Sequence, residues 1–315
     1  MERARERLAG VVERTPVVRL HVEDAPAEIW LKLESLQPIG SFKLRGAANA
    51  VLSAPREELA RGLVTTSTGN MAQGVAWMAR RLGVPATIVV PDNASGTKLA
   101  AVERLGGRVV RVPWERWWAA VEADEERDLG EGVAGFFVHP VRDPAVMAGN
   151  GTIGLELAEQ LPDLDAVLVP WGGGGLTTGV ASALRALRPE TRVYVCEPET
   201  GAPVSAALAN GGVPVPVPFT PSFVDGAGSG SLLPDMWERA RPLVEGAFAI
   251  SLSRTAETVR LLLERARIVA EGAAALPVAA ALAGLAGSGR VACIVSGGNI
   301  DAARLQAILA GRVPE

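Results

Sequence analysis

The chain has 315 residues, of which 48% are hydrophobic and 21% charged, a balance typical of soluble globular proteins with a sizeable core. Its formal net charge is -4 and it contains no long basic run, which argues against a nucleic-acid partner or an anionic membrane surface. The first residues carry charges throughout and no apolar run approaches the length of a membrane span, so a cytoplasmic protein is expected.

In the first part of the chain, short β-branched runs alternate with segments of helical period. Alternation of side chains every two residues predicts strands, and a repeat of 3.6 residues predicts helices. The predicted strands are 28–34, 62–67, 86–91 and 108–113, and the helices that follow them are 41–54, 70–83, 95–106 and 115–130.

The same alternation resumes after residue 165, with a glycine- and proline-rich stretch at 201–235 that predicts an ordered loop. The predicted strands are 166–170, 192–198 and 291–298, and the helical segments are 177–189, 202–212, a long one at 257–284, and 301–311. A βα repeat of this kind predicts an α/β fold with mostly parallel, twisted sheets covered by helices. Functional sites are then expected at the carboxyl ends of strands.

The first strand-to-helix junction with chemical interest holds Lys43. The chain has only three lysines, and the other two are Lys32 and Lys98. Lysine offers a primary amine that can lose its proton and attack a carbonyl group, which arginine does not. Gly40 permits a sharp turn and Ser41 is a typical N-cap residue, so Lys43 is expected in a first helical turn. There the helix dipole disfavours the ammonium form.

A second junction, at 170–179, reads PWGGGGLTTG. Successive glycines let backbone N–H groups converge on an anion at a helix N-terminus, so phosphate is the expected occupant. The spacing matches neither the dinucleotide fingerprint nor the P-loop. Two alternatives stay open: a tight turn without ligand, and a dinucleotide site in which Glu197 would bind the ribose.

Two further junctions carry small polar residues. The stretch TTSTGNMAQG, at 65–74, places hydroxyl groups, Gly69 and Asn70 before a helix whose amides can hold a carboxylate. The stretch VSGGNID, at 295–301, places Ser296 at the end of a strand. Together the four junctions supply an amine, a phosphate cradle, a carboxylate cradle and a strand-end hydroxyl, which are the parts needed to hold pyridoxal phosphate (PLP) and an amino acid.

Five stretches, SFKLRGAANA, STGNMAQGVA, AGNGTIGLE, VPWGGGGL and IVSGGNID, occur in this order along nearly the whole chain. They resemble those of the threonine dehydratase and serine racemase family of PLP enzymes, of fold type II. The resemblance implies two lobes with the cofactor between them: a large cofactor-binding domain of residues 1–46 and 145–315, and a small domain of residues 47–144.

By the same resemblance, Lys43 forms the Schiff base with the cofactor and Phe42 lies against its ring. Asn70 would bind the ring oxygen, and Ser296 would face the pyridine nitrogen. The phosphate would be bound by Gly172, Gly173, Gly174, Gly175 and the amide of Leu176. A neutral serine at the ring nitrogen leaves the pyridine unprotonated, which favours elimination over transamination.

The substrate carboxylate is expected around Ser67, Gly69 and Asn70, with Ser229 as a further contact. Thr68 occupies the position where racemases of the family place an acid/base serine, and Met71 stands where many members have histidine. Glu197 matches one metal ligand of some members, but Pro203 stands where their second carboxylate would be. No metal site is therefore expected.

The leading hypothesis is a dehydratase, or ammonia-lyase, that converts L-threonine, L-serine or both to 2-oxobutanoate or pyruvate and ammonia. The alternative is a serine or aspartate racemase with side elimination, and a third possibility is a nucleotide-binding regulatory protein without turnover. The expected partners are a small amino-acid substrate and further copies of the chain, in a dimer or tetramer. Packing roles are expected for Cys196, Cys293 and a group of tryptophans, Trp114, Trp117 and Trp118.

Overall fold

The computed structural model describes residues 1–92, 94, 96–122 and 133–314, with only the backbone described at 96–98, 118 and 120–122. Contacts within the chain divide it into two compact units. The first unit comprises Met1–Val12 and Lys43–Asn150, and the second comprises Glu13–Phe42 and Gly151–Glu315. The sequence-based domain boundaries, with a small domain of 47–144, stay a prediction.

The first unit contains the elements α1 (Glu2–Leu8), α2 (Lys43–Ser53), α3 (Arg56–Leu59), β3 (Leu63–Thr65), α4 (Asn70–Leu82), β4 (Ala86–Pro91), α5 (Gly96–Arg104), β5 (Arg108–Val112), α6 (Trp114–Glu122) and β6 (Phe136–Phe137). Helix α7 (Pro144–Gln160) begins in this unit and continues into the second.

The second unit contains the strands β1 (Val17–Arg19), β2 (Glu28–Leu33), β7 (Ala166–Pro170), β8 (Arg192–Pro198), β9 (Gly246–Ile250) and β10 (Arg290–Val295). Its helical elements are η1 (Glu34–Leu36), α8 (Gly175–Leu187), α9 (Pro203–Ala209), α10 (Pro234–Ala240), η2 (Arg241–Leu243), α11 (Leu252–Leu261), the π-helical turn η3 (Leu262–Ala266), α12 (Gly272–Leu282) and α13 (Ala302–Leu309).

The sheet of the first unit has the strand order β5-β4-β3-β6, and all its pairs are parallel. Leu63 at the start of β3 lies opposite both Ala86 and Phe136. Helix α4 packs on β3 and β4 and also against α2. Residues 66–70 therefore leave the carboxyl end of a central strand and enter the N-terminus of a packed helix.

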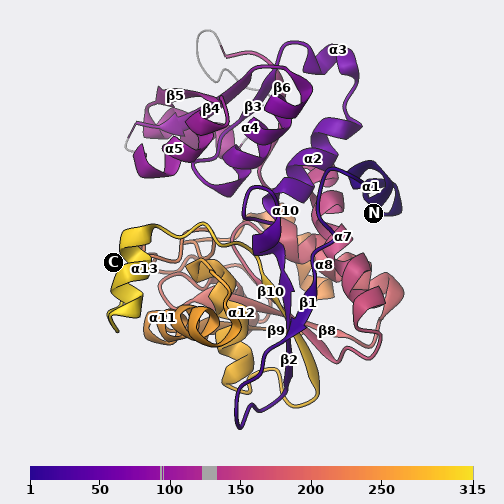
Figure 1. Ribbon diagram of the computed structural model, residues 1–315, viewed down its shortest axis with the longest axis vertical. Coiled ribbons are helices and arrows are strands. Elements are labelled where there is room, and N and C mark those ends of the chain that lie inside the picture. Colours follow the sequence, from indigo (N-terminus) through magenta and orange to yellow (C-terminus); the bar gives the residue numbers. More distant parts are fainter. Residues whose placement is uncertain (93, 95, 123–132, 315) are drawn as a thin grey trace. The chain divides into compact units, whose positions relative to one another are not determined.

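The sheet of the second unit has the order β1-β2-β10-β7-β8-β9. Figure 1 labels β1, β2, β8, β9 and β10 of this sheet. Only β1 is antiparallel, at the edge beside β2. The β2–β10 pair runs in register from Glu28 opposite Arg290 to Leu33 opposite Val295. The predicted α/β class with mostly parallel sheets is confirmed. No helix within the described ranges has the length and hydropathy needed to cross a membrane.

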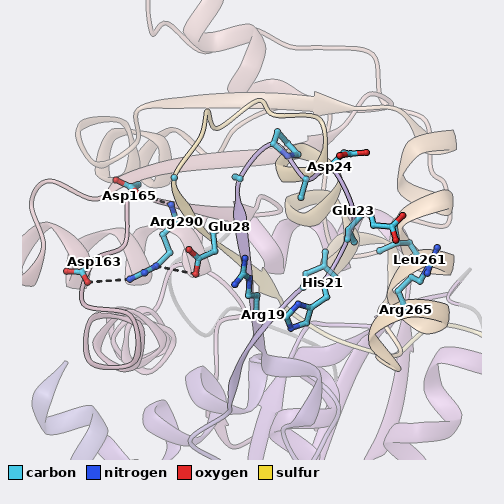
Figure 2. Close-up of a pocket in the computed structure, with 16 residues that line it drawn as sticks. Arg19, His21, Glu23, Asp24, Glu28, Asp163, Asp165, Leu261, Arg265 and Arg290 are labelled. Atoms are coloured by element: carbon cyan, nitrogen blue, oxygen red, sulfur yellow. Dashed lines mark hydrogen bonds and ion pairs between the residues drawn. The ribbon is translucent and has the colours of Figure 1, made fainter.

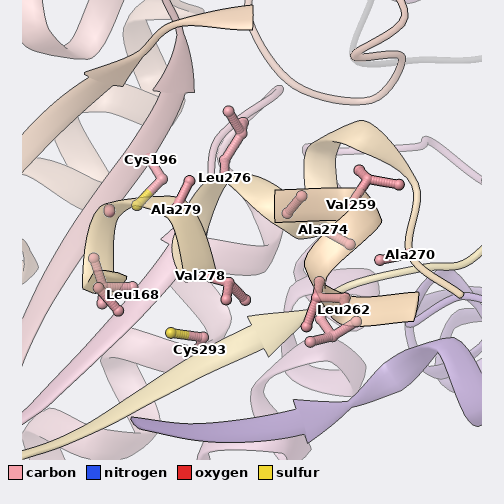
Figure 3. Close-up of a cluster of buried hydrophobic side chains, with 14 of the residues drawn as sticks. Leu168, Cys196, Val259, Leu262, Ala270, Ala274, Leu276, Val278, Ala279 and Cys293 are labelled. Atoms are coloured by element: carbon pink, nitrogen blue, oxygen red, sulfur yellow. The ribbon is translucent and has the colours of Figure 1, made fainter. Parts of the chain in front are cut away.

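The inner strands of this second sheet are buried on both faces, which explains why β7 and β10 are nearly continuous apolar runs. One face packs Leu168 and Cys293 against the helices α11 and α12, and Figure 3 shows this cluster. The other face packs Val167 and Ile294 against α7 and α8. The two cysteines, Cys196 and Cys293, are free and fully buried in the first cluster, and burial raises the pKa of both thiols.

The long helical segment predicted at 257–284 is in fact two helices. Helix α11 ends in the π-helical turn η3, and Arg267 then adopts a left-handed conformation with φ of 61°. The chain passes through a short extended stretch before α12 begins at Gly272. Apolar residues continue at helical spacing on both sides of this break, so the period alone does not reveal it.

Candidate functional site

The segment before Lys43 is fixed to the end of β10 within the second unit. Ser41 forms an antiparallel bridge with Gly297, and the backbone N–H of Phe42 donates to the carbonyl of Ser296 at 3.0 Å. Gly40 has φ of 70°, and its carbonyl accepts a hydrogen bond from the N–H of Gly298 at 2.9 Å. Phe42 and Ser296 are both buried. Two predicted cofactor residues, distant in sequence, are therefore neighbours.

Lys43 is the first residue of α2, as its pattern predicts, and its side chain is partly exposed. Its Nζ donates to the carbonyl of Pro140 at 3.2 Å. Lys32, in contrast, is 0% exposed, and its Nζ lies 2.5 Å from Glu156 Oε2. The same ammonium also donates to the carbonyl of Thr15 and to Gln160 Oε1, each at 2.8 Å. The three donors of Lys32 are thus used within the core.

The glycine loop, Gly172 to Gly175, joins β7 to α8 in a form that excludes side chains. A Cβ atom on Gly172 would lie 2.6 Å from the carbonyl oxygen of Gly226. Gly174 has φ of 92°, and a Cβ there would lie 2.7 Å from the ring of Trp171. That ring is 1% exposed and packs edge-on against Trp237, with centroids 6.4 Å apart. Neither the Gly226 carbonyl nor the buried Trp171 ring can move easily, so side chains are excluded here. The backbone amides at the start of α8 are therefore accessible to an anion.

The polar groups of this loop fit a phosphate. Thr177 and Thr178, in the first turns of α8, are 0% and 7% exposed, and their Oγ1 atoms have no hydrogen-bond partner in the described part of the protein. Buried hydroxyl groups are nearly always paired, and an unpaired pair of them beside open helix amides indicates a missing acceptor. The phosphate of PLP is an acceptor of the right charge for a helix N-terminus.

Ser296 and the glycine loop lie at the same side of the sheet, where the strands have their carboxyl ends. Strands β7 and β10 are parallel neighbours, so the residues that follow them lie at the same end. The carbonyl of Trp171 accepts from the N–H of Gly228 at 2.8 Å, which brings the next residue, Ser229, beside the loop. The Ser229 hydroxyl donates to the carbonyl of Ser231 at 2.8 Å.

In the first unit, Ser67, Thr68, Gly69 and Asn70 follow β3, and α4 begins at Asn70. Gly69 is the N-cap and supplies no side-chain cap, and a Cβ on it would meet nothing within 4 Å. The N–H of Gly69 donates to Ser67 Oγ at 3.3 Å. Open space at Gly69, beside the N-terminus of α4, suits a small carboxylate, as the sequence predicts for the substrate.

Glu197, at the carboxyl end of β8, is occupied within the protein. Its carboxylate accepts from the N–H groups of Val204 and Ser205 and from the Ser205 hydroxyl, each at 2.9 Å, and so caps α9. It is 0% exposed, and burial raises the pKa of this carboxyl group, although the three hydrogen bonds act in the opposite direction. Its use as a cap leaves little capacity for a ribose or a metal ion.

Glu271 is a candidate site residue that the sequence analysis missed. Its N–H donates to the carbonyl of Gly297 at 3.0 Å, and a Cβ on Gly297 would lie 2.7 Å from Glu271 Oε1. This carboxylate therefore covers the glycine that follows Ser296. The available signal was the sequence Glu-Gly at the start of α12, which the assumption of one long helix concealed.

A cavity of about 1380 Å³ lies at the other ends of these strands, where they begin (Figure 2). It is lined by residues at the amino ends of β2, β7 and β10, among them Glu28, Asp165 and Arg290. Arg290 pairs there with Asp163 at 3.4 Å and with Glu28 at 3.5 Å. Two carboxylates at this end of the strands are thus paired with Arg290, whereas α/β enzymes place their chemistry at the carboxyl ends of the strands.

The two-sided parallel sheet, the lysine at a helix start and the glycine cradle for a phosphate define a class, the PLP enzymes of fold type II. The sequence family described as "Pyridoxal-phosphate dependent enzyme" matches residues 8–297, and the chain belongs to this family. PLP is accordingly its cofactor.

Individual relatives narrow the group. The L-threonine ammonia-lyase of Geobacter sulfurreducens is 39% identical over 98% of this chain and 77% of its own length. Maize serine racemase has a TM-score of 0.88 and 31% identity, covering 98% of this chain and 95% of that one. The threonine deaminase of T.th. has a TM-score of 0.86 and 35% identity, covering 95% and 97%. This chain is a PLP-dependent enzyme of the threonine dehydratase and serine racemase group.

Proposed function

We propose that the protein is an ammonia-lyase that converts L-threonine, L-serine or both to 2-oxobutanoate or pyruvate and ammonia. The observation that carries the proposal is the similarity to an L-threonine ammonia-lyase over almost the whole chain. The dehydratase-like features of the residues themselves, a neutral serine after β10 and a threonine at position 68, point in the same direction.

In this proposal Lys43 holds the cofactor and Phe42 lies against its ring. The phosphate is bound by the amides of the glycine loop and of Leu176, Asn70 binds the ring oxygen, and Ser296 faces the ring nitrogen. When bound, PLP withdraws electrons from the substrate Cα and so weakens the bond to the α proton. A neutral Ser296 hydroxyl limits this withdrawal and so favours loss of a β substituent.

The substrate carboxylate is held by the residues around the start of α4, Ser67, Gly69 and Asn70, with Ser229 as a further contact. Lys43 Nζ takes the α proton, and the β-hydroxyl group leaves with a proton as water. The product is an enamine, which takes up water and releases ammonia as the 2-oxo acid forms. One water is lost when the enamine forms, and one water is taken up when ammonia is released. No oxidant or reductant is therefore needed.

Racemisation is the second candidate, because a serine racemase is among the similar structures. It requires an acid/base group on the face of the substrate opposite Lys43, within about 2.6–3.2 Å of the proton path. By its resemblance to racemases, position 68 would supply that group, and here it is threonine. The branched Cβ restricts the hydroxyl rotamers and adds a methyl group, so elimination is expected to dominate.

The deciding experiment follows pyruvate and D-serine in parallel from L-serine, with L-threonine and its 2-oxo acid as a second substrate. We expect 2-oxo acid to form far faster than any D-amino acid. Thr68→Ala should leave elimination largely intact, and Thr68→Ser should raise the yield of D-serine. D-serine appearing as fast as pyruvate in the unmodified enzyme would instead establish a racemase.

We also propose that the protein forms a homodimer or homotetramer. Leu36 is 55% exposed and Val269 is 43% exposed in the second unit. Backbone near both residues meets at Gly298, where a Cβ would lie 2.8 Å from the Val269 carbonyl and 3.4 Å from Ser35 Cβ. A contact between copies of the chain that covered these side chains would bury their apolar surface. Sedimentation velocity on the purified enzyme tests the proposal, and a monomer at all concentrations would contradict it.

A further inference from the structure

Thr177 and Thr178 differ from the two buried threonines of helix α11. Threonine inside a helix usually donates its hydroxyl to the carbonyl four residues earlier. Thr255 and Thr258 of α11 do so, to Ser251 and Arg254, both at 2.8 Å. Thr177 and Thr178 are equally buried, yet neither hydroxyl finds an acceptor in the described part of the protein. An unpaired buried hydroxyl group destabilises the folded protein, so its presence here needs a reason.

The position of Thr177 suggests the reason. Gly174 is the N-cap of α8, and Thr177 is the third residue of the helix. Side chains lean toward the N-terminus of their helix, so the side chain of this third residue lies over the first turn. Its hydroxyl is therefore expected at the same opening as the unpaired amides of the first turn. The side chain of Thr178 projects in another direction, about 100° further around the helix axis than that of Thr177.

We propose that Thr177 Oγ1 donates a hydrogen bond to the phosphate of bound PLP and completes the cradle of backbone amides. The inference rests on the proposed binding of the phosphate at the glycine loop. A hydroxyl donor to a phosphate oxygen forms a short, charge-assisted hydrogen bond. The protein accepts an unsatisfied hydroxyl without the cofactor because the acceptor arrives with it.

The test compares PLP with pyridoxal, which lacks the phosphate, on cofactor-free protein. Thr177→Val keeps the shape of the side chain and removes the hydroxyl. We expect its apparent dissociation constant for PLP to rise about 10- to 100-fold, the range for a lost hydrogen bond to a charged group. Its affinity for pyridoxal should stay within about twofold of the unmodified protein, since only a phosphate contact is removed.

Stability of the cofactor-free protein gives a second, independent readout. Thr177→Val removes an unsatisfied buried hydroxyl, so its unfolding temperature should be unchanged or higher. Thr255→Val is the matched control, because it removes a buried hydroxyl that is already paired. That variant should unfold at a lower temperature and bind PLP normally.

Each other outcome has a distinct meaning. An equal loss of PLP and pyridoxal affinity in Thr177→Val would overturn the inference, as would a loss specific to Thr178→Val. If Gly174→Asp strips PLP while Thr177→Val binds it normally, the phosphate lies at the loop and only the role of Thr177 is wrong. If neither variant weakens PLP binding, the proposed place of the phosphate is itself wrong.

Discussion

The backbone N–H of Phe42 donates to the carbonyl of Ser296 at 3.0 Å, and this bond ties the residue before Lys43 to the end of β10. One peptide bond separates Phe42 from Lys43, so the proposed reactive amine starts from a backbone anchored in the second unit. The bridge between Ser41 and Gly297 adds a second anchor. A fixed base of this kind limits the positions that the side chain can sample.

Borohydride reduction should fix PLP on Lys43 and on no other residue. Lys32 is excluded by its burial and by the three acceptors of its ammonium. With three lysines in the chain, peptide mapping by mass spectrometry locates the adduct without ambiguity. Lys43→Ala should lose turnover by about 10²–10⁴-fold, the contribution of a positioned acid/base group. An adduct on Lys32 or Lys98 would contradict the assignment.

Gly174→Asp should strip the cofactor from the protein. The new side chain would meet the ring of Trp171, and its carboxylate would repel the phosphate. The yellow absorbance of the purified protein and its PLP content measure the loss. Gly211→Asp is the matched control, because Gly211 has a similar positive φ of 69° but nothing within 4 Å of its Cβ position. Cofactor loss in both variants would point to backbone strain rather than to the cradle.

The junctions were well predicted from sequence because each depends on local chemistry. Lys43 and Asn70 begin helices where their patterns indicate, and α8 begins at Gly175, two residues before its predicted start. Glycines and small polar residues act on the turn in which they occur. The strands beside them are short apolar runs buried on both faces, which are equally recognisable. The sequence also predicted that positions 172 and 174 require glycine. It did not predict which atoms, the Gly226 carbonyl and the Trp171 ring, exclude a side chain there.

Features set by distant contacts were not predictable. Strand β9 pairs with β8 through a stretch, Gly246–Ile250, that has no polar alternation, and β6 is only two residues long. Arg267 ends a helical pattern without glycine or proline, because tertiary packing overrides its local preference. The position of Glu271 over Gly297 depends on that break, and the Glu-Gly pair at the start of α12 was the one local signal for it.

Breaking the buried pair of Lys32 and Glu156 should destabilise the protein strongly. Glu156→Gln leaves a buried ammonium without a counter-charge, which costs about 3–5 kcal/mol of unfolding free energy. The double variant Lys32→Met, Glu156→Met should recover most of this loss, because both charges are removed together. Urea unfolding measures both.

The control is Glu264→Gln, which breaks an exposed pair with Arg260, 2.9 Å apart, on one helical surface. That change should cost less than about 1 kcal/mol. If the double variant were as unstable as Glu156→Gln, the uncompensated charge would not explain the loss of unfolding free energy.

Glu197 should make stability depend on pH in a defined direction. Burial raises the pKa of its carboxyl group above the ordinary value of 4.5. The folded protein therefore binds this proton more tightly than the unfolded chain, and the contribution is fully present below about pH 4.5 and is lost as pH rises through the raised pKa. The unfolding free energy of the unmodified protein minus that of Glu197→Gln should fall across this window. Ser205→Ala, which removes a hydrogen bond that lowers the pKa, should extend the fall to higher pH.

The parallel pairing of β2 with β10 also sets an order of events during synthesis. The first unit has all its residues once residue 150 has left the ribosome, whereas β2 gains its inner neighbour only when residues 290–295 emerge. At typical translation speeds the interval is roughly 7–30 s. Throughout it, a nascent chain carries Lys43 on a unit whose residues are all present, while β2 presents an open strand edge. Chaperone dependence, and the moment at which cofactor can first be captured, should follow from the release of the last strand.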